Sequence, residues 1–352
     1  MINTTYYQDL TKMNTFGMKV KARCFMEYDS VADLVDIEFE ELARPVLHIG
    51  GGSNLLFTDD FKGTILHSKI NFIEILEEVH RGDPHEPSVV LVSVGAGVVF
   101  DDFCAWAAKE GLWGVENLSY IPGEVGASAV QNIGAYGVEV KDVIHKVYCY
   151  DTIEEEFVSF GVEECEYGYR DSIFKDPEVK GRYIVTHVVF ALSRTPQPRL
   201  EYGHLKAAVE SAGSELTAAL IRKVIIKIRK EKLPEPSVMG SAGSFFKNPV
   251  ISAEHFSRIE AAAKSERGAE YKVPHYDMSD GMVKVPAAWM IEQCGWKGRR
   301  SGGAAVYDKQ PLVIVNYTGD AYPEEIIGLE RRIIASVKAK FDIDLHPEVE
   351  HI

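Results

Sequence analysis

The stretch Gly50 to Phe57, GGGSNLLF, lies between two short apolar runs and decides how the first part of the chain folds. The runs are Val46 to Ile49 and Gly63 to His67, and their aliphatic residues predict two strands. The glycines between them form a turn whose backbone a ligand can approach closely. Because exposed backbone N–H groups can hold anions, this strand, turn and strand unit is a candidate phosphate-binding element.

A second glycine-rich turn, Gly95-Ala96-Gly97, follows an apolar strand-like run from Ser88 to Val94. It precedes a predicted helix over Asp101 to Glu110, which either of its first two aspartates can cap. Neither turn has the third glycine of the G-x-G-x-x-G fingerprint, since Leu55 and Phe100 stand there, and no G-x-x-x-x-G-K-[ST] motif occurs. A dinucleotide would therefore bind through another architecture.

A third glycine-rich segment, Gly111 to Gly137, contains six glycines and has little periodicity. It predicts a long loop, and loops of that length inside a compact domain are usually functional. Downstream, the runs Val143–Tyr150, Glu155–Phe160 and Tyr183–Leu192 predict antiparallel strands. The fold class is therefore α+β rather than a regular βαβ alternation.

Two amphipathic helices are expected in the second half of the chain. One covers Leu216 to Lys230, and Pro234 and Pro236 after it mark a domain boundary. The other covers Glu324 to Phe341, with Pro323 at its start. The polar segment Glu77–Pro87 predicts a hairpin loop. The expected apolar stripes are Leu216, Leu220, Val224 and Ile228 in the first helix, and Ile326, Leu329, Ile333 and Val337 in the second.

The composition argues against several classes of protein. With 38 basic and 53 acidic residues the net charge is −15, which disfavours binding to nucleic acid or anionic membranes but leaves local anion sites open. No apolar run approaches the roughly 20 residues that span a bilayer, and the N-terminus lacks a secretory pattern. The five cysteines are scattered without a C-x-x-C pair, so we expect reduced thiols, no metal site and a cytoplasmic location.

The stretch Gly240 to Pro249, GSAGSFFKNP, is the best candidate for chemistry. Ser244 stands between a glycine and two phenylalanines, which could exclude water, and Lys247 and Asn248 follow. Taken alone, the stretch is more simply a glycine-bounded turn that leads into an edge strand. Its partners elsewhere in the chain must decide between the two interpretations.

Seven segments, in order, resemble the UDP-N-acetylenolpyruvoylglucosamine reductase (MurB) family, in its tyrosine-loop subclass. Together they extend over nearly the full chain, which makes the set far more specific than any single motif. The segments are Asn14–Ala22, Gly50–Phe57, Ile121–Gly137, Tyr167–Lys175, Gly240–Pro249, Ala287–Gly298 and His346–Ile352.

The resemblance implies an α+β fold with a two-part FAD-binding domain of the vanillyl-alcohol-oxidase (PCMH) type and a C-terminal α+β substrate-binding domain. The implied parts are residues 1–66 with 346–352 returning to them, residues 67–231, and residues 232–345. Gly50 to Asn54 would cradle the FAD pyrophosphate, and Ile121 to Gly137 would wrap the rest of the cofactor. The implied FAD contacts are Gly50, Gly51, Gly52, Ser53, Asn54, Ile121, Pro122, Gly126, Ala127, Ser128, Asn132 and Gly134.

The resemblance also implies an activity: NADPH-dependent, FAD-mediated reduction of UDP-N-acetylglucosamine enolpyruvate to UDP-N-acetylmuramate, a step of peptidoglycan synthesis that supports cell-wall growth, cell shape and cell division. Hydride reaches the terminal enolpyruvyl carbon, and a proton reaches the carbon beside the carboxylate. Ser244 matches the proton donor, Arg170 the arginine that holds the carboxylate, and Glu348 a glutamate that stabilises the enol and needs a raised pKa. Further substrate contacts carry over to Tyr169, Tyr202, Lys232, Asn248 and Gln293.

Each catalytic assignment has a structural alternative. Ser244 could be a turn or capping residue, Arg170 could pair with a neighbouring acid, and Glu348 could be a solvated residue near the chain end. For the whole chain, the alternatives are another flavin oxidoreductase of the same fold or a non-catalytic UDP-sugar or flavin-binding regulator. We expect a monomer that takes small-molecule substrates.

Overall fold

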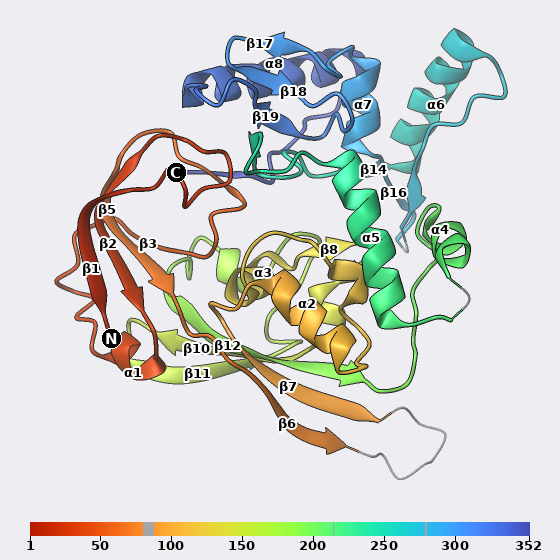
Figure 1. The fold of residues 1–352 in the computed structure, drawn as a ribbon. Coiled ribbons are helices and arrows are strands. Elements are labelled where there is room, and N and C mark those ends of the chain that lie inside the picture. The colour runs from red at the N-terminus through yellow and green to blue at the C-terminus, as the bar shows by residue number, and fades with distance from the viewer. Residues whose placement is uncertain (80–87, 214, 279) are drawn as a thin grey trace. The chain divides into compact units, whose positions relative to one another are not determined.

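The computed structural model describes residues 1–79, 88–213, 215–278 and 280–352, and the chain divides into two compact units (Figure 1). Unit 1 comprises residues 1–10, 21–52 and 60–231, and unit 2 comprises residues 11–20, 53–59 and 232–352. Each unit is therefore assembled from segments that are far apart in the sequence. No helix in the described part of the chain is both long and apolar enough to cross a membrane.

The first sheet of unit 1 contains the glycine-turn strands. β3 pairs in parallel with β5, β5 pairs in parallel with β2, and β1 joins β2 antiparallel at the edge. The predicted strands before and after the glycine turn are confirmed as β3 and β5. The elements are β1 (Asn3–Asp9), β2 (Lys21–Tyr28), the short helix α1 (Val31–Val35), β3 (Val46–Ile49) and β5 (Phe61–Ser68).

The second sheet of unit 1 has the order β11-β10-β12-β7-β6, and its neighbouring strands are all antiparallel. The predicted antiparallel strands are thus confirmed. The predicted hairpin loop from residue 77 is wrong at its start, because β6 continues to Val79; the rest of that loop lies outside the described residues. The elements are β6 (Ile73–Val79), β7 (Val89–Gly95), β10 (Ile144–Asp151), β11 (Glu156–Gly161) and β12 (Tyr183–Ser193).

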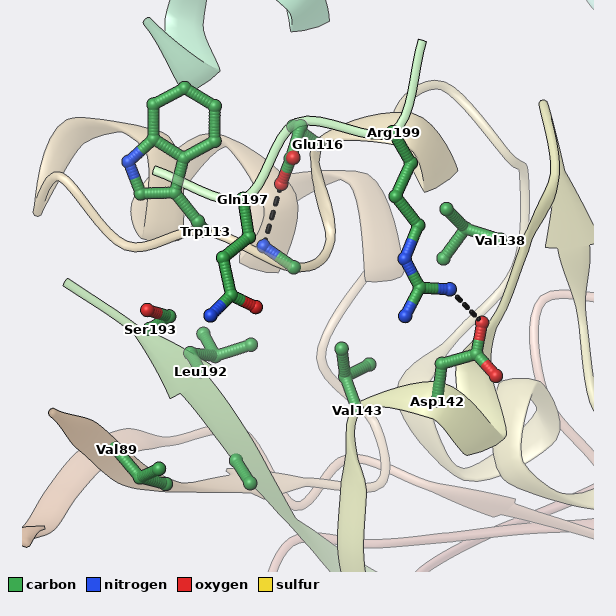
Figure 2. A pocket seen from close by; sticks show the side chains of 12 residues that line it. Val89, Trp113, Glu116, Val138, Asp142, Val143, Leu192, Ser193, Gln197 and Arg199 are labelled. Carbon is green, nitrogen blue, oxygen red and sulfur yellow. Dashed lines mark hydrogen bonds and ion pairs between the residues drawn. The ribbon is translucent and has the colours of Figure 1, made fainter. Parts of the chain in front are cut away.

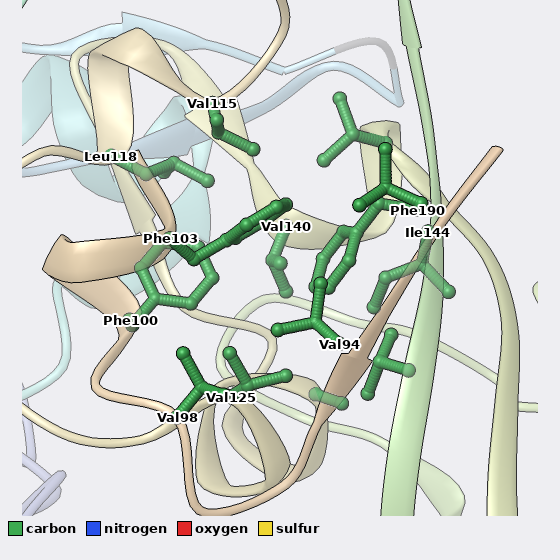
Figure 3. Packing of buried hydrophobic residues seen from close by; sticks show 14 of the residues in the cluster. Val94, Val98, Phe100, Phe103, Val115, Leu118, Val125, Val140, Ile144 and Phe190 are labelled. Carbon is green, nitrogen blue, oxygen red and sulfur yellow. The ribbon is translucent and has the colours of Figure 1, made fainter. Parts of the chain in front are cut away.

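The helices α2 (Phe100–Lys109) and α3 (Val125–Gln131) cover one face of this second sheet and build its core. Figure 3 shows Phe103 of α2 against Phe190 of β12, and their ring centroids are 4.6 Å apart. Both rings are fully buried, and each such side chain stabilises the fold by roughly 2–3 kcal/mol. This contact packs α2 against the second sheet.

The segment from residue 111 to 137 is not the unbroken loop that its glycines predict. It contains α3, whose small residues carry no helical stripe because the helix packs too closely for larger ones. A Cβ on Gly126 would lie 2.9 Å from the Cβ of Ala96. The short elements in and around this segment are the 3-10 turns Glu116–Leu118, Val140–Asp142 and Ile173–Lys175 and the strands β8 (Gly134–Ala135) and β9 (Val138–Glu139).

Two details of the predicted helices are corrected. The N-cap of α2 is Val99 rather than an aspartate, because the carboxylate of Asp101 instead accepts from the backbone N–H of Tyr120 and from Arg222. The helix expected at 216–230 is α5 (Ala218–Lys232), after α4 (Leu205–Ala212). Leu216 lies outside α5, and the fully buried positions are Ala218, Ile221, Val224 and Ile225, since a strict four-residue spacing drifts off a face that repeats every 3.6 residues.

One buried ion pair of the second sheet gives a stability prediction. Asp151 is buried at the end of β10 and accepts from Arg182 Nε at 2.9 Å and Nη2 at 2.6 Å. Replacing Asp151 by Ala leaves that guanidinium without its carboxylate, and we expect the melting temperature to fall by about 5 °C. The control is Glu154→Ala, whose carboxylate is exposed and 3.7 Å from the same arginine; an equal fall in both variants would contradict the prediction.

The same ion pair sets a direction for acid unfolding. Burial alone would raise the pKa of Asp151, but the hydrogen bonds from Arg182 and from the backbone N–H groups of Ile153 and Glu154, together with the charge of Arg182, outweigh burial and hold the pKa below its usual range. The stabilisation is therefore present above the unfolded pKa of about 3.9 and is lost as the pH falls through the lower folded value.

Unit 2 contains a four-stranded antiparallel sheet and a three-stranded one. The predicted C-terminal helix is confirmed as α8, and its four expected stripe residues are all buried. The strands are β13 (Gly240–Ser241), β14 (Val250–Ser252), β15 (Tyr276–Asp277), β16 (Met282–Lys284), β17 (Arg300–Ser301), β18 (Ala304–Val306) and β19 (Ile314–Asn316), and the helices are α6 (Ala253–Arg267), α7 (Ala287–Gln293) and α8 (Pro323–Phe341).

Segments that are far apart in the sequence pair within unit 2. β20 (Glu350–His351) pairs in parallel with β4 (Leu55–Leu56), and the backbone N–H of Ser241 donates to the carbonyl of Thr15 at 2.9 Å. In unit 1, by contrast, Tyr28 and Leu34 share a core with Tyr150 and Ile184 of the second sheet. The three-part division expected from the sequence stays a prediction about domains.

Candidate functional site

The segment around Ser244 is held by backbone pairing on both sides. The N–H of Phe245 donates to Leu312 O at 2.8 Å, and its carbonyl accepts from the N–H of Glu348 at 2.8 Å. The N–H of Lys247 donates to His346 O at 2.9 Å. Phe245 and Phe246 are buried, whereas Ser244 is half-buried. The backbone pairing therefore brings Ser244 and the backbone of Glu348 to one place in unit 2.

Hydrogen bonds hold the segment around Glu348 in place. The side-chain amide of Asn54 donates to the carbonyl of Glu348 at 3.1 Å, and Asn54 O accepts from the N–H of Glu350 at 3.0 Å. Further along, the N–H of Ile352 donates to Leu56 O at 2.9 Å. Asn54, expected at the FAD pyrophosphate, therefore also fixes the segment from Glu348 to Glu350.

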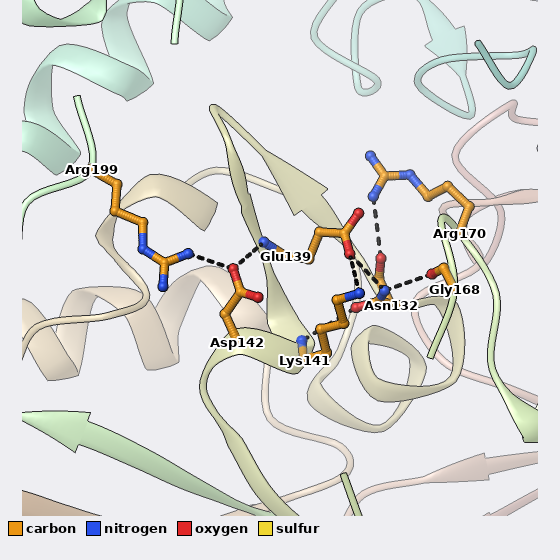
Figure 4. A network of polar contacts seen from close by, with 7 residues as sticks. All are labelled: Asn132, Glu139, Lys141, Asp142, Gly168, Arg170 and Arg199. Carbon is orange, nitrogen blue, oxygen red and sulfur yellow. Dashed lines mark hydrogen bonds and ion pairs between the residues drawn. The ribbon is translucent and has the colours of Figure 1, made fainter. Parts of the chain in front are cut away.

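Arg170 is held by backbone carbonyls of unit 1. Its Nη1 donates to Asn132 O at 3.2 Å and its Nη2 to Gly134 O at 2.6 Å (Figure 4). A Cβ on Gly134 would lie 2.9 Å from Nη1, so this position requires glycine. The guanidinium also lies 5.5 Å from the ring centroid of Tyr169. The two carbonyls fix the orientation of the guanidinium, whose planar fork of N–H donors suits a carboxylate.

Asn132, whose carbonyl accepts from Arg170, is itself held in place by hydrogen bonds. Its φ is +43°, its side chain is fully buried, and its amide nitrogen donates to Gly168 O at 2.7 Å and to Glu139 Oε2 at 3.1 Å. Its amide oxygen accepts from the N–H of Lys141 at 3.2 Å. The FAD contact expected of Asn132 stays a prediction, and the structure adds Glu139 and Gly168, which have no sequence signal of their own.

The glycine turn after β3 lies against the start of α3. A Cβ on Gly50 would lie 3.2 Å from both the Cβ of Ala127 and Oε2 of Glu124, and Gly52 has a φ of +61°. Two of the segments expected to hold FAD, residues 50–52 and 121–128, are thus neighbours in unit 1. A cradle that a Cβ would crowd fits a ligand whose phosphates approach the backbone closely. Ser128, by contrast, donates its hydroxyl to Val125 O at 2.7 Å within α3.

The cradle gives a direct test of cofactor binding. Replacing Gly50 by Ala must displace Ala127 or the Glu124 carboxylate by a few tenths of an ångström, and we expect FAD affinity to fall roughly ten- to hundredfold while the chain stays folded. Flavin fluorescence quenching measures the affinity. The control is Gly328→Ala in α8, where a Cβ meets nothing within 4 Å; unchanged FAD affinity in Gly50→Ala would exclude this turn as the cofactor site.

The expected substrate contacts are distributed over both units. Tyr202 packs edge-on against Tyr136 at 5.9 Å, and burial raises the pKa of Tyr136. Lys232 is exposed at the end of α5. Asn248 accepts through Oδ1 from the N–H of Ala287, the first residue of α7, at 2.9 Å. These positions stay predicted contacts.

Gln293 lies in a pocket of 290 Å³ lined by α6, α7 and the end of α8. Its amide oxygen accepts from Arg267, and its backbone carbonyl accepts from Lys340 at 3.4 Å. Arg258 also lines the pocket. The carboxylates of Glu266 and Asp342 line the same pocket, and Glu266 pairs with Lys340 at 3.7 Å, so the positive charge of the pocket is partly offset.

A separate pocket of 360 Å³ in unit 1 is lined by none of the predicted site residues (Figure 2). Its buried Glu116 accepts from the N–H of Gly114 at 2.7 Å, and burial raises the pKa of that carboxyl. At its other side, Arg199 donates to Asp142 at 2.6 Å. Glu116 and the Arg199–Asp142 pair are thus each engaged within the wall of the pocket.

Two family models match the chain, one described as an FAD binding domain over residues 23–155 and one as the C-terminal domain of UDP-N-acetylenolpyruvoylglucosamine reductase over residues 235–352. A UDP-N-acetylenolpyruvoylglucosamine reductase of Bacteroides fragilis is 50% identical over 345 residues, covering 97% of this chain and 98% of the relative. The Porphyromonas gingivalis reductase is 44% identical over 346 residues, covering 97% of each.

Among solved structures, the MurB reductase from Thermus caldophilus superposes with a TM-score of 0.66 at 22% identity and covers 100% of this chain and 98% of that one. At that level of identity the superposition bears on the fold alone.

Proposed function

The chain belongs to the UDP-N-acetylenolpyruvoylglucosamine reductase family of flavin-dependent oxidoreductases in peptidoglycan synthesis, and from that premise we propose that it reduces UDP-N-acetylglucosamine enolpyruvate to UDP-N-acetylmuramate with NADPH as the reductant. When bound, FAD supplies to the terminal enolpyruvyl carbon the hydride that it has received from NADPH. The residues of this chain would bind the substrate, stabilise the developing negative charge and deliver the proton.

Ser244 delivers the proton to the carbon beside the carboxylate. A serine hydroxyl is a very weak acid, so the transfer requires a strongly basic carbanion and a site that excludes water. The buried Phe245 and Phe246 next to it supply an apolar wall. The serine oxygen regains its proton from water or from Lys247, which completes the proton balance.

Arg170 and Glu348 act on the substrate carboxylate. The planar guanidinium binds the two carboxylate oxygens through parallel N–H donors, and the carbonyls of Asn132 and Gly134 fix its orientation. Glu348, whose backbone carbonyl accepts from Asn54, would donate a hydrogen bond from its protonated carboxyl to the enolate oxygen as negative charge develops there. This role requires a protonated Glu348.

One observation carries the proposal: the backbone pairing of residues 245–247 with residues 346–348, which joins Ser244 and Glu348 from positions about 100 residues apart in the sequence. An oxidase or a regulator of the same fold has no chemical need for this pair. Such an arrangement suits a site where a proton and a negative charge are handled together.

The test is an anaerobic pair of half-reactions. NADPH should bleach the visible absorbance of the bound flavin, and the enolpyruvyl sugar nucleotide should then restore it while UDP-N-acetylmuramate forms. Bleaching without restoration would favour another flavin oxidoreductase, and no bleaching would favour a non-catalytic binding protein. We further propose a monomer that acts in the cytoplasm without nucleic-acid or membrane partners; sedimentation velocity tests the monomer.

A further inference from the structure

A buried histidine of unit 1 joins two carboxylates. His67 on β5 is 6% exposed, with Nδ1 3.0 Å from Glu27 Oε1 and Nε2 3.0 Å from Glu124 Oε1. Neutral imidazole has one N–H and could donate to only one of them, whereas the imidazolium donates to both. The geometry therefore favours the protonated ring.

The sheet register places this histidine beside the glycine turn. Across the parallel strands, His67 pairs with Glu27 of β2 on one side and with Ile49 of β3 on the other. Ile49 directly precedes Gly50, so the backbone of His67 lies next to the point where the chain enters the turn. His67 and the start of the Gly50–Gly52 turn therefore lie on neighbouring strands of one sheet.

Glu124 carries the contact to the turn itself. It is the N-cap residue of α3, yet its carboxylate makes no capping hydrogen bond. Oε1 is held by His67 instead, and Oε2 would lie 3.2 Å from a Cβ on Gly50. A carboxylate in that position would repel the diphosphate of a cofactor unless a neighbouring cation offsets its charge.

We propose that His67 is a positioning residue for the cofactor, whose imidazolium holds Glu124 against the Gly50–Gly52 turn and offsets its charge, so that FAD binds more weakly when His67 is neutral. The inference rests on the proposed function, because it places the FAD diphosphate at this turn. With the ring protonated, the three groups carry a net charge of −1; with the ring neutral, they carry −2. Affinity is therefore highest at low pH and falls as the pH rises.

Of His67 and the neighbouring His48 and Tyr28, His67 is the group expected to change its protonation state. Burial would lower the pKa of His67, but the hydrogen bond and charge of Glu124 and the hydrogen bond of Glu27 outweigh burial and the nearby Lys69, and the pKa is raised above 6.5. Burial lowers the pKa of His48 to about 3, and burial raises that of Tyr28, which bonds to it. Both therefore stay neutral between pH 6 and 9, and the change in affinity belongs above pH 6.5.

The test measures the FAD dissociation constant of the full chain, freed of flavin, by fluorescence quenching from pH 6 to pH 9. For the native chain we expect the constant to rise about tenfold over this range, as expected when one charge changes near a dianion. In His67→Gln the constant should be about five- to tenfold higher at pH 6 and nearly independent of pH. His145→Gln, an exposed histidine on β10, is the matched control and should follow the native chain.

A native pH profile in His67→Gln would overturn the proposal. A second measurement does not depend on how that variant folds: in the native chain, NMR titration of His67 should show its pKa rising by about one unit when FAD binds, by linkage. An unchanged pKa would also overturn it. If Gly50→Ala binds FAD normally, the assignment of the turn fails instead; if Gly50→Ala loses FAD while His67→Gln behaves as native, only the role of His67 fails.

Discussion

Replacing Ser244 by Ala should slow formation of UDP-N-acetylmuramate by about 10²–10⁴-fold, the range that a positioned proton donor contributes. The half-reaction with NADPH should proceed at the native rate, because Ser244 acts only after hydride transfer begins. Stopped-flow absorbance of the flavin separates the two steps: the fast bleaching stays, and the return of colour with the enolpyruvyl substrate becomes slow.

The matched control is Ser237→Ala, an exposed serine seven positions earlier in the same unit. Its two half-reactions should both be native. Fold damage is checked by the flavin spectrum and the melting temperature, since Phe245 and Phe246, rather than Ser244, supply the burial that fixes the segment. If Ser244→Ala turns over at the native rate, the serine is a turn residue and another group gives the proton.

Replacing Arg170 by Lys should lower kcat/KM for the enolpyruvyl substrate by about 10²–10³-fold, even though the positive charge is kept. The ammonium has no planar fork, so it cannot reach Asn132 O and Gly134 O together and still present two donors to a carboxylate. Reduction of the flavin by NADPH should change little.

Arg194→Lys is the control for this variant, because Arg194 also donates to a backbone carbonyl, that of Glu110 at 2.8 Å, but it matches no site residue. Steady-state kinetics at varied substrate concentration measure both variants. Full activity in Arg170→Lys would mean that Arg170 serves only to hold its loop.

The family membership and the α+β, FAD-binding fold predicted from the sequence are confirmed, and the reason lies in motifs with strict local requirements. A Cβ would collide with its neighbours at Gly134 and would be crowded at Gly50, so the requirement for glycine at these positions is visible in the sequence. The apolar stripe of α8 is also predicted correctly, because one face of that helix is buried along its whole length.

The parts that the sequence missed depend on contacts between distant segments. The motif that contains Asn132 predicts a cofactor ligand. In the folded chain, however, its amide nitrogen donates to Glu139 and Gly168, which the sequence alone does not bring near. The helix α3 was hidden because close packing selects small residues without a periodic pattern. His67 reads as the end of an apolar strand, and its two carboxylate partners lie 40 and 57 positions away.

The parallel pairing of β20 with β4 has a consequence for how the protein is made. Unit 2 needs residues 11–20 and 53–59, which are synthesised early, and residues 346–352, which are synthesised almost 290 positions later. The early segments must wait through the synthesis of nearly the whole chain before their partner strand exists, whereas the sheets of unit 1 are complete by residue 193. The Ser244 region therefore cannot complete its pairing until residues 346–351 have been synthesised.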